Sequence, residues 1–250
     1  MKKFFRKVLI FLGTLAGIIL LLLVLYLVRA KSAIKQMTPV ETMQINSDVY
    51  AIKDGYVNMY LIKDGASFIA IDAGNKKRIV KDGLKYLNID PDQVTTVILT
   101  HSDSDHTGAI SLFKDARVYL PKEEEQLING ETGRFLFFGN HLEVKNYKLL
   151  DDEILWIGST KILPIPMPGH TPGATCYVIN DKYLFTGDAL SLKENRIDIF
   201  PKFINKNARR ARKSISNITG LNNVQYIFTG HHGYTDDYAG AVSQWVDQNE

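Results

Sequence analysis

Four residues of types that bind metal ions lie within six positions of the sequence. They are His101, Asp103, Asp105 and His106, in the stretch Thr-His-Ser-Asp-Ser-Asp-His-Thr-Gly from Thr100 to Gly108. Imidazole nitrogens and carboxylate oxygens are ligands that zinc, manganese and iron accept in proteins. In an extended loop, alternate side chains along this stretch would converge on one pocket, and the last His would turn to its other side. The spacing therefore predicts a metal centre.

A purely structural role is the alternative for this stretch. Asp105 or Thr107 would then cap the N-terminus of a helix, and the two histidines would be incidental. The metal-centre and the capping interpretations share the same predicted secondary structure on either side of this stretch. Val94–Leu99 is β-branched and apolar, which predicts a buried strand, and Thr107–Phe113 predicts the first turns of a helix. The stretch would thus form a loop at the C-terminal end of a strand, where α/β folds place their chemistry.

The stretch resembles the signature of the metallo-β-lactamase superfamily, His-x-His-x-Asp-His-x-x-Gly. Asp103 stands where that signature has its second His, and Gly108 comes one position early. The resemblance extends from about Val49 to the C-terminus. Four further motifs of the superfamily match in chain order: Ile71–Gly74 (Ile-Asp-Ala-Gly), Pro168–Gly173 (Pro-Gly-His-Thr-Pro-Gly), Thr186–Asp188 (Thr-Gly-Asp) and Thr229–His231 (Thr-Gly-His).

The resemblance implies two metal positions that share one carboxylate. The first would be held by His101, Asp103 and His170, the second by Asp105, His106 and His231, and Asp188 would bridge them. His231 is preferred to His232 because it directly follows the Thr-Gly pair. Asp72 is expected to orient a ligand imidazole or the loop. The implied cofactors are two divalent ions, zinc first, with manganese or iron as alternatives because Asp103 adds an oxygen ligand.

Such a ligand set indicates hydrolysis. Three protein ligands per ion leave coordination open for water, and a metal ion can lower the pKa of that water from 15.7 to about 7. Asp105 would position the water and carry its proton. We therefore expect a metal-dependent hydrolase of a small ester, thioester, lactone or amide. The alternatives are a phosphodiesterase or nuclease, a di-iron redox protein (usually accompanied by an electron-transfer domain for which this chain has no room), and a non-catalytic metal-stabilised module.

The hydropathy pattern predicts two strand-rich halves, each followed by helices. Predicted strands include Ser67–Ile71, Val94–Leu99 and Ala174–Ile179, and predicted helices include Lys76–Leu87 and Asp237–Gln248. This order favours two sheets packed face to face with helices outside, which is the four-layer αββα sandwich that the resemblance also implies. The strand-end loops of both halves would then meet at one edge. Cys176, the one cysteine, falls in a predicted strand and is expected to be buried.

The N-terminal region predicts a membrane anchor. Val8–Val28 is an uncharged apolar run of 21 residues, which as a helix would span about 31 Å. A cleaved signal peptide is the alternative, with Val28-Arg29-Ala30 as the cleavage site. A slight excess of basic residues before the run favours a single-pass chain with its catalytic domain outside the cytoplasm. Gly13 and Gly17 form a Gly-x-x-x-Gly pair that could support a homodimer.

Charge and composition complete the predicted organisation. The net charge is +3, but five of the 30 basic residues and none of the 27 acidic residues lie in residues 1–30. The remainder is nearly neutral, so we do not expect a nucleic-acid partner, only a small-molecule substrate and, through residues 8–28, a lipid bilayer. The predicted division is an anchor over residues 1–30, a linker over 31–42 and a metallo-hydrolase domain over 43–250.

Two segments match no motif and are predicted to set substrate choice, residues 130–150 and 190–206. The first contains an apolar cluster, Phe135–Phe138, between glycines. It would form either a hairpin that packs on the body or an apolar wall over the pocket. His141 also lies there, outside any motif, and is expected to be structural or on the surface.

Overall fold

The apolar N-terminal run forms one long helix, α1 (Lys2–Lys35), in the computed structural model, which describes residues 2–249. The most apolar window of α1 has a mean hydropathy of 3.1 and none of it is buried, so by length and composition this helix can cross a membrane. The helix continues through residues 31–35, where the sequence suggested a linker. Contacts divide the chain into two units, residues 1–37 and residues 38–250, and α1 belongs to the first.

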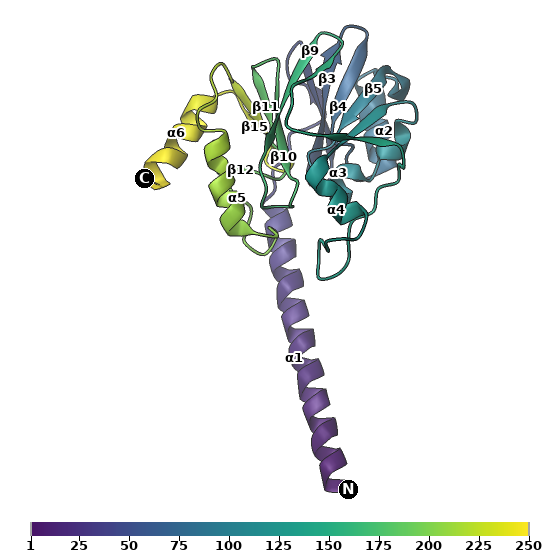
Figure 1. The fold of residues 1–250 in the computed structure, drawn as a ribbon, viewed down its shortest axis with the longest axis vertical. Helices are drawn as coiled ribbons and strands as arrows, with labels where there is room; N and C mark the ends of the chain where they lie inside the picture. Colours follow the sequence, from purple (N-terminus) through teal and green to yellow (C-terminus); the bar gives the residue numbers. More distant parts are fainter. Residues whose placement is uncertain (1, 250) are drawn as a thin grey trace. The chain divides into compact units, whose positions relative to one another are not determined.

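The second unit is built on two mixed β-sheets (Figure 1). In the first sheet, β1 to β4 run antiparallel to their neighbours, and β4 to β7 run parallel. Its seven strands, in spatial order, are β1 (Met43–Gln44), β2 (Val49–Asp54), β3 (Val57–Asp64), β4 (Ser67–Ile71), β5 (Val94–Ile98), β6 (Arg117–Pro121) and β7 (Tyr147–Leu150).

The second sheet has six strands and one parallel pair, β11 with β14. In spatial order these strands are β15 (Tyr234–Thr235), β14 (Tyr226–Phe228), β11 (Tyr183–Phe185), β10 (Thr175–Ile179), β9 (Thr160–Pro166) and β8 (Leu155–Ile157). A separate hairpin pairs β12 (Ser191–Lys193) with β13 (Arg196–Asp198). Cys176 is fully buried in β10.

Helices cover the outer face of each sheet (Figure 1). Those beside the first sheet are α2 (Lys77–Tyr86), α3 (Ser104–Thr107) and α4 (Glu125–Ile128), and those beside the second are α5 (Ala208–Ser214) and α6 (Tyr238–Asn249). Strand alternation explains the layers, because Ile69 and Ile71 pack against the opposite sheet whereas Phe68 and Ala70 pack on the side of α2. A third cluster joins the second sheet to α6 and to Ile215 and Ile218, which follow α5. The predicted αββα sandwich is confirmed.

The five motifs gather at one edge because each follows the end of a strand. β4 ends directly before Asp72. β5, β11 and β14 end three residues before His101, Asp188 and His231, and β9 ends four residues before His170. Backbone hydrogen bonds then hold the loops to one another: Thr175 N donates to Thr100 O at 3.0 Å, and Gly230 N donates to Gly187 O at 2.9 Å. Strand ends and these bonds between loops therefore bring distant parts of the chain together.

Two local predictions are wrong. The helix predicted over Thr107–Phe113 is instead the single turn α3, followed by a 3₁₀ turn at Ile110–Leu112. Gly108 keeps helical dihedrals, and the helical conformation ends at Ala109, where φ is −106° and ψ is 11°. A Cβ at Gly108 would lie 2.1 Å from Asn75 O, so this close approach requires glycine. A further prediction, that Phe135–Phe138 packs as a hairpin on the body, also fails. An isolated bridge joins Phe135 to Phe138, but all four side chains are at least 60% exposed.

Candidate metal centre

The seven predicted ligand residues come together at the loop edge. Their candidate ligand atoms form three overlapping groups, and within each group the atoms lie within 4.8 Å of one another. The groups are His101 with Asp103 and His170, His101 with His106 and Asp188, and Asp105 with His106 and His231. Asp105 lies beside His106 rather than in line with His101 and Asp103, because the chain leaves the extended conformation and enters α3 after Asp103.

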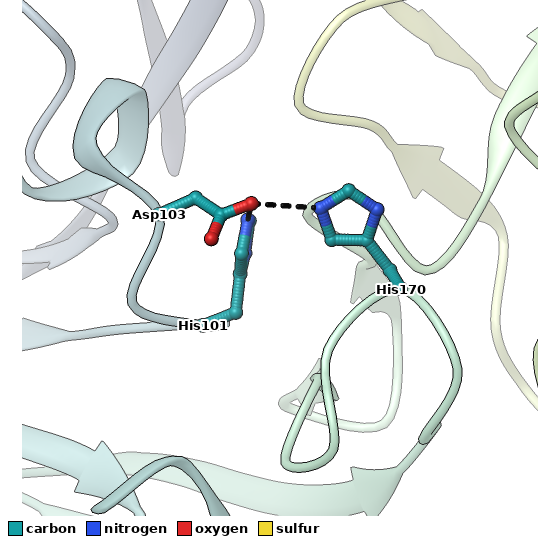
Figure 2. A group of neighbouring side chains, drawn as sticks. All are labelled: His101, Asp103 and His170. Carbon is teal, nitrogen blue, oxygen red and sulfur yellow. Dashed lines mark hydrogen bonds and ion pairs between the residues drawn. The ribbon is translucent and has the colours of Figure 1, made fainter. Parts of the chain in front are cut away.

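The first group joins the two sheets (Figure 2). Asp103 Oδ2 lies 3.1 Å from His170 Nε2 and 3.7 Å from His101 Nε2. His101 and Asp103 follow β5 of the first sheet, whereas His170 follows β9 of the second. Both imidazoles are buried, and the Asp103 side chain is 17% exposed. The carboxylate points at the histidines, and its own bonds are to side chains, so it does not merely brace the loop backbone.

The group of Asp105, His106 and His231 is as closely packed, and Asp188 contacts both it and His170 of the first group. Asp188 Oδ1 lies 3.1 Å from His106 Nε2 and 3.1 Å from His231 Nε2, and its Oδ2 lies 3.4 Å from His170 Nε2. Asp105 Oδ2 is 3.5 Å from His231 Nε2. Gly230 allows this approach, because a Cβ at that position would lie 2.7 Å from Asp188 Oδ1 and 2.8 Å from His106 Cε1.

The ring orientations fit metal coordination through Nε2. His106 Nδ1 lies 2.8 Å from Asp72 Oδ2, and His231 Nδ1 lies 2.6 Å from Tyr56 O, so each Nδ1–H has an acceptor. His101 Nδ1 lies 3.0 Å from Thr100 Oγ1, which itself donates to Asp72. The Nε2 lone pairs of these three rings are therefore directed into the site. His101 Nε2 is buried without a hydrogen-bond partner, as expected for an atom whose partner is an ion.

The electrostatic field of the site favours a cation. Burial lowers the pKa of His106, but Asp188 and Asp72 outweigh burial and hold its pKa well above the ordinary value. Burial and the neighbouring His106 hold the pKa of His101 well below its ordinary value. A field that stabilises a proton on His106 also stabilises a metal ion at the same point. Asp72 contacts both the His106 ring, at 2.8 Å from Nδ1, and the loop, where it accepts from Thr100 N at 2.7 Å.

Comparison with known proteins decides the family. The family model described as "Metallo-beta-lactamase superfamily" matches residues 52–231. The chain belongs to the metallo-beta-lactamase superfamily. With its His and Asp groups, it is a metal-dependent hydrolase of that superfamily.

Relatives within the superfamily are metallo-hydrolases of several kinds. The chain is 30% identical over 167 residues to a probable metallo-hydrolase of Methanocaldococcus jannaschii, covering 66% of this chain and 71% of the relative. It is 32% identical over 148 residues to a hydroxyacylglutathione hydrolase of Dictyostelium discoideum, covering 51% of this chain and 48% of the relative. A metallo-beta-lactamase family protein of Thermus thermophilus has the same fold, with a TM-score of 0.64 at 19% identity over 82% of this chain and 80% of that one.

Arg134 and Asn140 are site residues that sequence reasoning missed. Arg134 Nε donates to Asp103 Oδ1 at 2.8 Å, its Nη2 donates to Asp103 Oδ2 at 2.7 Å, and Asn140 Nδ2 donates to Oδ1 at 2.9 Å. Burial raises the pKa of Asp103, but the bond with His170, the nearby His101 and the bond from Arg134 together hold its pKa well below the ordinary value. Both residues lie in the motif-free segment after α4, where no pattern marked them.

Glu124 is a third residue that the sequence did not reveal. It lies in a charged stretch that resembles a solvated helix, yet it is completely buried. Its carboxylate accepts from Ser102 N at 2.8 Å and from Gly173 N at 2.9 Å. Glu124 therefore ties the loop of His101 and Asp103 to the loop of His170.

The remaining histidines lie outside the ligand groups. Burial and the adjacent His231 lower the pKa of His232 to about 4, so its ring is neutral, and it joins none of the three groups. His141 is exposed, in agreement with the surface position considered for it. Tyr56 stacks on His231 with ring centroids 5.6 Å apart. Burial, followed by the charge of Asp105, raises the pKa of Tyr56 to about 12, which keeps its phenol protonated at neutral pH.

Proposed function

We propose that this chain hydrolyses a small ester, thioester, lactone or amide with two divalent ions, zinc by preference, as a membrane-anchored enzyme. The observation that carries this proposal is the position of Asp188 among three imidazoles. Its Oδ1 lies 3.1 Å from His106 Nε2 and from His231 Nε2, and its Oδ2 lies 3.2 Å from His231 Nε2 and 3.4 Å from His170 Nε2. The first ion would be held by His101, Asp103 and His170, the second by Asp105, His106 and His231, with Asp188 shared. This is the ligand set proposed from the sequence.

Ions bound there would lower the pKa of water and polarise an acyl carbonyl. The protein residues perform the other tasks. Asp72, Tyr56 O and Thr100 hold three imidazoles in the tautomer that exposes Nε2. Asp105 is the residue we assign to proton movement, because its carboxylate reaches within 3.5 Å of His231 Nε2 while its side chain remains 19% exposed. It can therefore contact both the site and an entering water molecule.

A thioester is the first substrate class to test. The Dictyostelium relative is named for hydroxyacylglutathione, which is a thioester. In this chain, the exposed run Phe135–Phe138 directly follows Arg134, which contacts Asp103. An apolar segment this close to the candidate metal centre supports an acyl group as the part of the substrate that is recognised.

A substrate screen on the full chain in detergent tests the proposed reaction. Thioesters, esters, lactones, amides including β-lactams, and a phosphodiester would each be assayed with the metal content measured in the same preparation. We expect turnover of at least one acyl substrate, lost after chelation and restored by added zinc. Hydrolysis of the phosphodiester alone would replace the proposal with a phosphodiesterase, and full activity after complete metal removal would refute it.

The anchor is proposed from α1, whose apolar residues are exposed along its length. We expect the full chain to fractionate with membranes and residues 38–250, which have their own core, to be soluble. Protease added to intact cells should remove the catalytic unit if it lies outside the cytoplasm. Full-length protein in the soluble fraction would refute the anchor, and a catalytic unit cut only after lysis would reverse the orientation.

A further inference from the structure

Arg134 forms an ion pair with Asp103, the carboxylate that stands where the superfamily signature has its second His. Its Nε and Nη2 form a two-pronged contact with Asp103, and both side chains are largely buried, 18% and 17% exposed. Nη2 also lies 3.1 Å from His170 Nε2 and 3.3 Å from Ile204 O. A planar guanidinium that meets a carboxylate in this way forms one of the stronger charge-assisted contacts in proteins.

The segment that carries Arg134 is held in place by its own bonds. Arg134 N donates to Phe138 O at 2.7 Å, and Asn140 N donates to Leu127 O at 2.8 Å. Asn140 also bonds Ser102 Oγ at 2.8 Å and Asp103 Oδ1 at 2.9 Å. These bonds fix the backbone on both sides of Arg134, so the fold itself positions the guanidinium beside Asp103.

We propose that Arg134 compensates the charge of Asp103, so that the first metal position presents a neutral ligand pair where the signature has a neutral His. This inference rests on the proposed metal centre and adds the role of one residue to it. An anionic carboxylate alone would bind an ion more tightly than an imidazole does. Paired with a guanidinium, it offers an oxygen ligand with no net charge, which limits how firmly the first ion is held.

The contacts also show which part of the interaction is compatible with an ion. An Nε2 atom that coordinates a metal has no lone pair left to accept a hydrogen bond, so the contact of Arg134 with His170 would be lost. The contact of Arg134 Nε with Asp103 Oδ1 can persist, because Oδ1 lies beside Arg134 and Asn140. Asp103 Oδ2 lies beside the two imidazoles and also accepts from Arg134 Nη2 at 2.7 Å, and a carboxylate oxygen has a second lone pair with which to do so. Arg134 would therefore act through Asp103 as a positioning residue.

Metal titration of the full chain in detergent tests this role without measuring turnover. Zinc retained during competition with a chelator gives the affinity of each position, and the absorption spectrum of the cobalt-loaded protein reports the ligands. The variants are Arg134→Gln, Arg134→Lys, Asp103→His and the double variant Asp103→His with Arg134→Gln. Arg78→Gln is the matched control, because Arg78 is 83% exposed on α2.

We expect Arg134→Gln to hold the more weakly bound ion at least about tenfold more tightly, because the carboxylate charge is no longer offset. Arg134→Lys keeps the charge and should stay near the parent. Asp103→His leaves the guanidinium uncompensated beside the ion and should weaken binding by at least about tenfold. The double variant should return to within about threefold of the parent, with a cobalt spectrum shifted by the added nitrogen ligand.

Three results would overturn the role of Arg134. They are unchanged or weaker binding in Arg134→Gln, a lysine variant that behaves like the glutamine variant, and an Asp103→His single variant that holds both ions as firmly as the parent. A parent chain that retains no ion would instead refute the proposed metal centre. Two firmly bound ions with no response to the substitutions would refute only this inference.

Discussion

The two halves of the candidate metal centre are built from similar ligands but are supported differently. In the first, the carboxylate of Asp103 forms an ion pair with the guanidinium of Arg134. In the second, the Asp105 carboxylate lies 3.5 Å from His231 Nε2, and the ring of His106 is backed by a further carboxylate, Asp72, at 2.8 Å. The protein therefore removes negative charge behind the first position and adds it behind the second. Ligand identity alone does not show this difference.

Under the proposed function, this difference in charge gives the two metal positions different chemical roles. A position surrounded by uncompensated carboxylates holds a cation firmly, whereas a neutral position leaves its ion a stronger Lewis acid. Arg134, which contacts Asp103 of the first position, directly precedes the exposed apolar segment Phe135–Phe138, and this position would polarise the substrate. The first position would therefore be the one that lowers the pKa of water, and the second, with Asp105 partly exposed, would place that carboxylate to accept the proton.

Removal of Asp188 should have the largest effect, because this residue faces both positions. We expect Asp188→Ala to lower turnover by at least about a thousandfold and to reduce the number of ions retained per chain, with folding largely kept. Metal analysis and a thermal melt of the same preparation check this. Asp82→Ala, which alters an exposed carboxylate on α2, is the control. Unchanged metal content and rate would remove Asp188 from the site and with it the link between the two positions.

Much of this arrangement could be predicted from the sequence, for a local reason. The five motifs are short, and each directly follows an apolar strand, so strand periodicity places them at one edge of the sandwich. The resemblance to the superfamily motifs singled out His101, His170 and His231, and strand periodicity placed their loops at one edge, although 130 positions separate the first from the last. What the sequence lacked was any periodic signal for residues that reach the site from irregular segments.

Arg134 and Glu124 show why the remainder was not predictable. Arg134 lies 31 positions from Asp103 in a segment without regular structure, so its partner depends on tertiary packing. Glu124 has the composition of a solvated helix, with charged neighbours on both sides, and only the approach of Ser102 and Gly173 explains its burial. The charge balance of the first position therefore emerged only from the three-dimensional structure.

Substitution of Asp72 should separate the two positions. Its Oδ2 bonds His106 Nδ1 directly at 2.8 Å, whereas it reaches His101 only through Thr100. We expect Asp72→Asn to weaken metal binding about 10- to 100-fold, the range found when the partner of a ligand imidazole is removed, with the larger loss at the second position. Chelator competition followed by cobalt absorption measures it, with Asp82→Asn as the control. An equal loss at both positions would show that Asp72 braces the loop as a whole.

The smallest expected effect, and the sharpest test of the contrast between the positions, concerns metal preference and pH. From the sequence alone, Asp103→His should raise the ratio of zinc to manganese and lower the pH midpoint of activity. With Arg134 in place, we expect the higher ratio only in the double variant Asp103→His with Arg134→Gln, because nitrogen then replaces oxygen without leaving an unpaired guanidinium. Its pH midpoint should stay close to that of the parent, since one neutral arrangement replaces another.

Arg134→Gln alone should move the pH midpoint upward, because an uncompensated carboxylate makes the ion a weaker Lewis acid and leaves its water harder to deprotonate. Rates would be measured between about pH 5 and pH 9 with saturating zinc, with Arg78→Gln as the control. If the midpoint of Arg134→Gln matches that of the parent, the ion does not respond to the charge of Asp103. The two positions would then differ in ligand type alone, and the negative charge behind His106 would have no counterpart to be compared with.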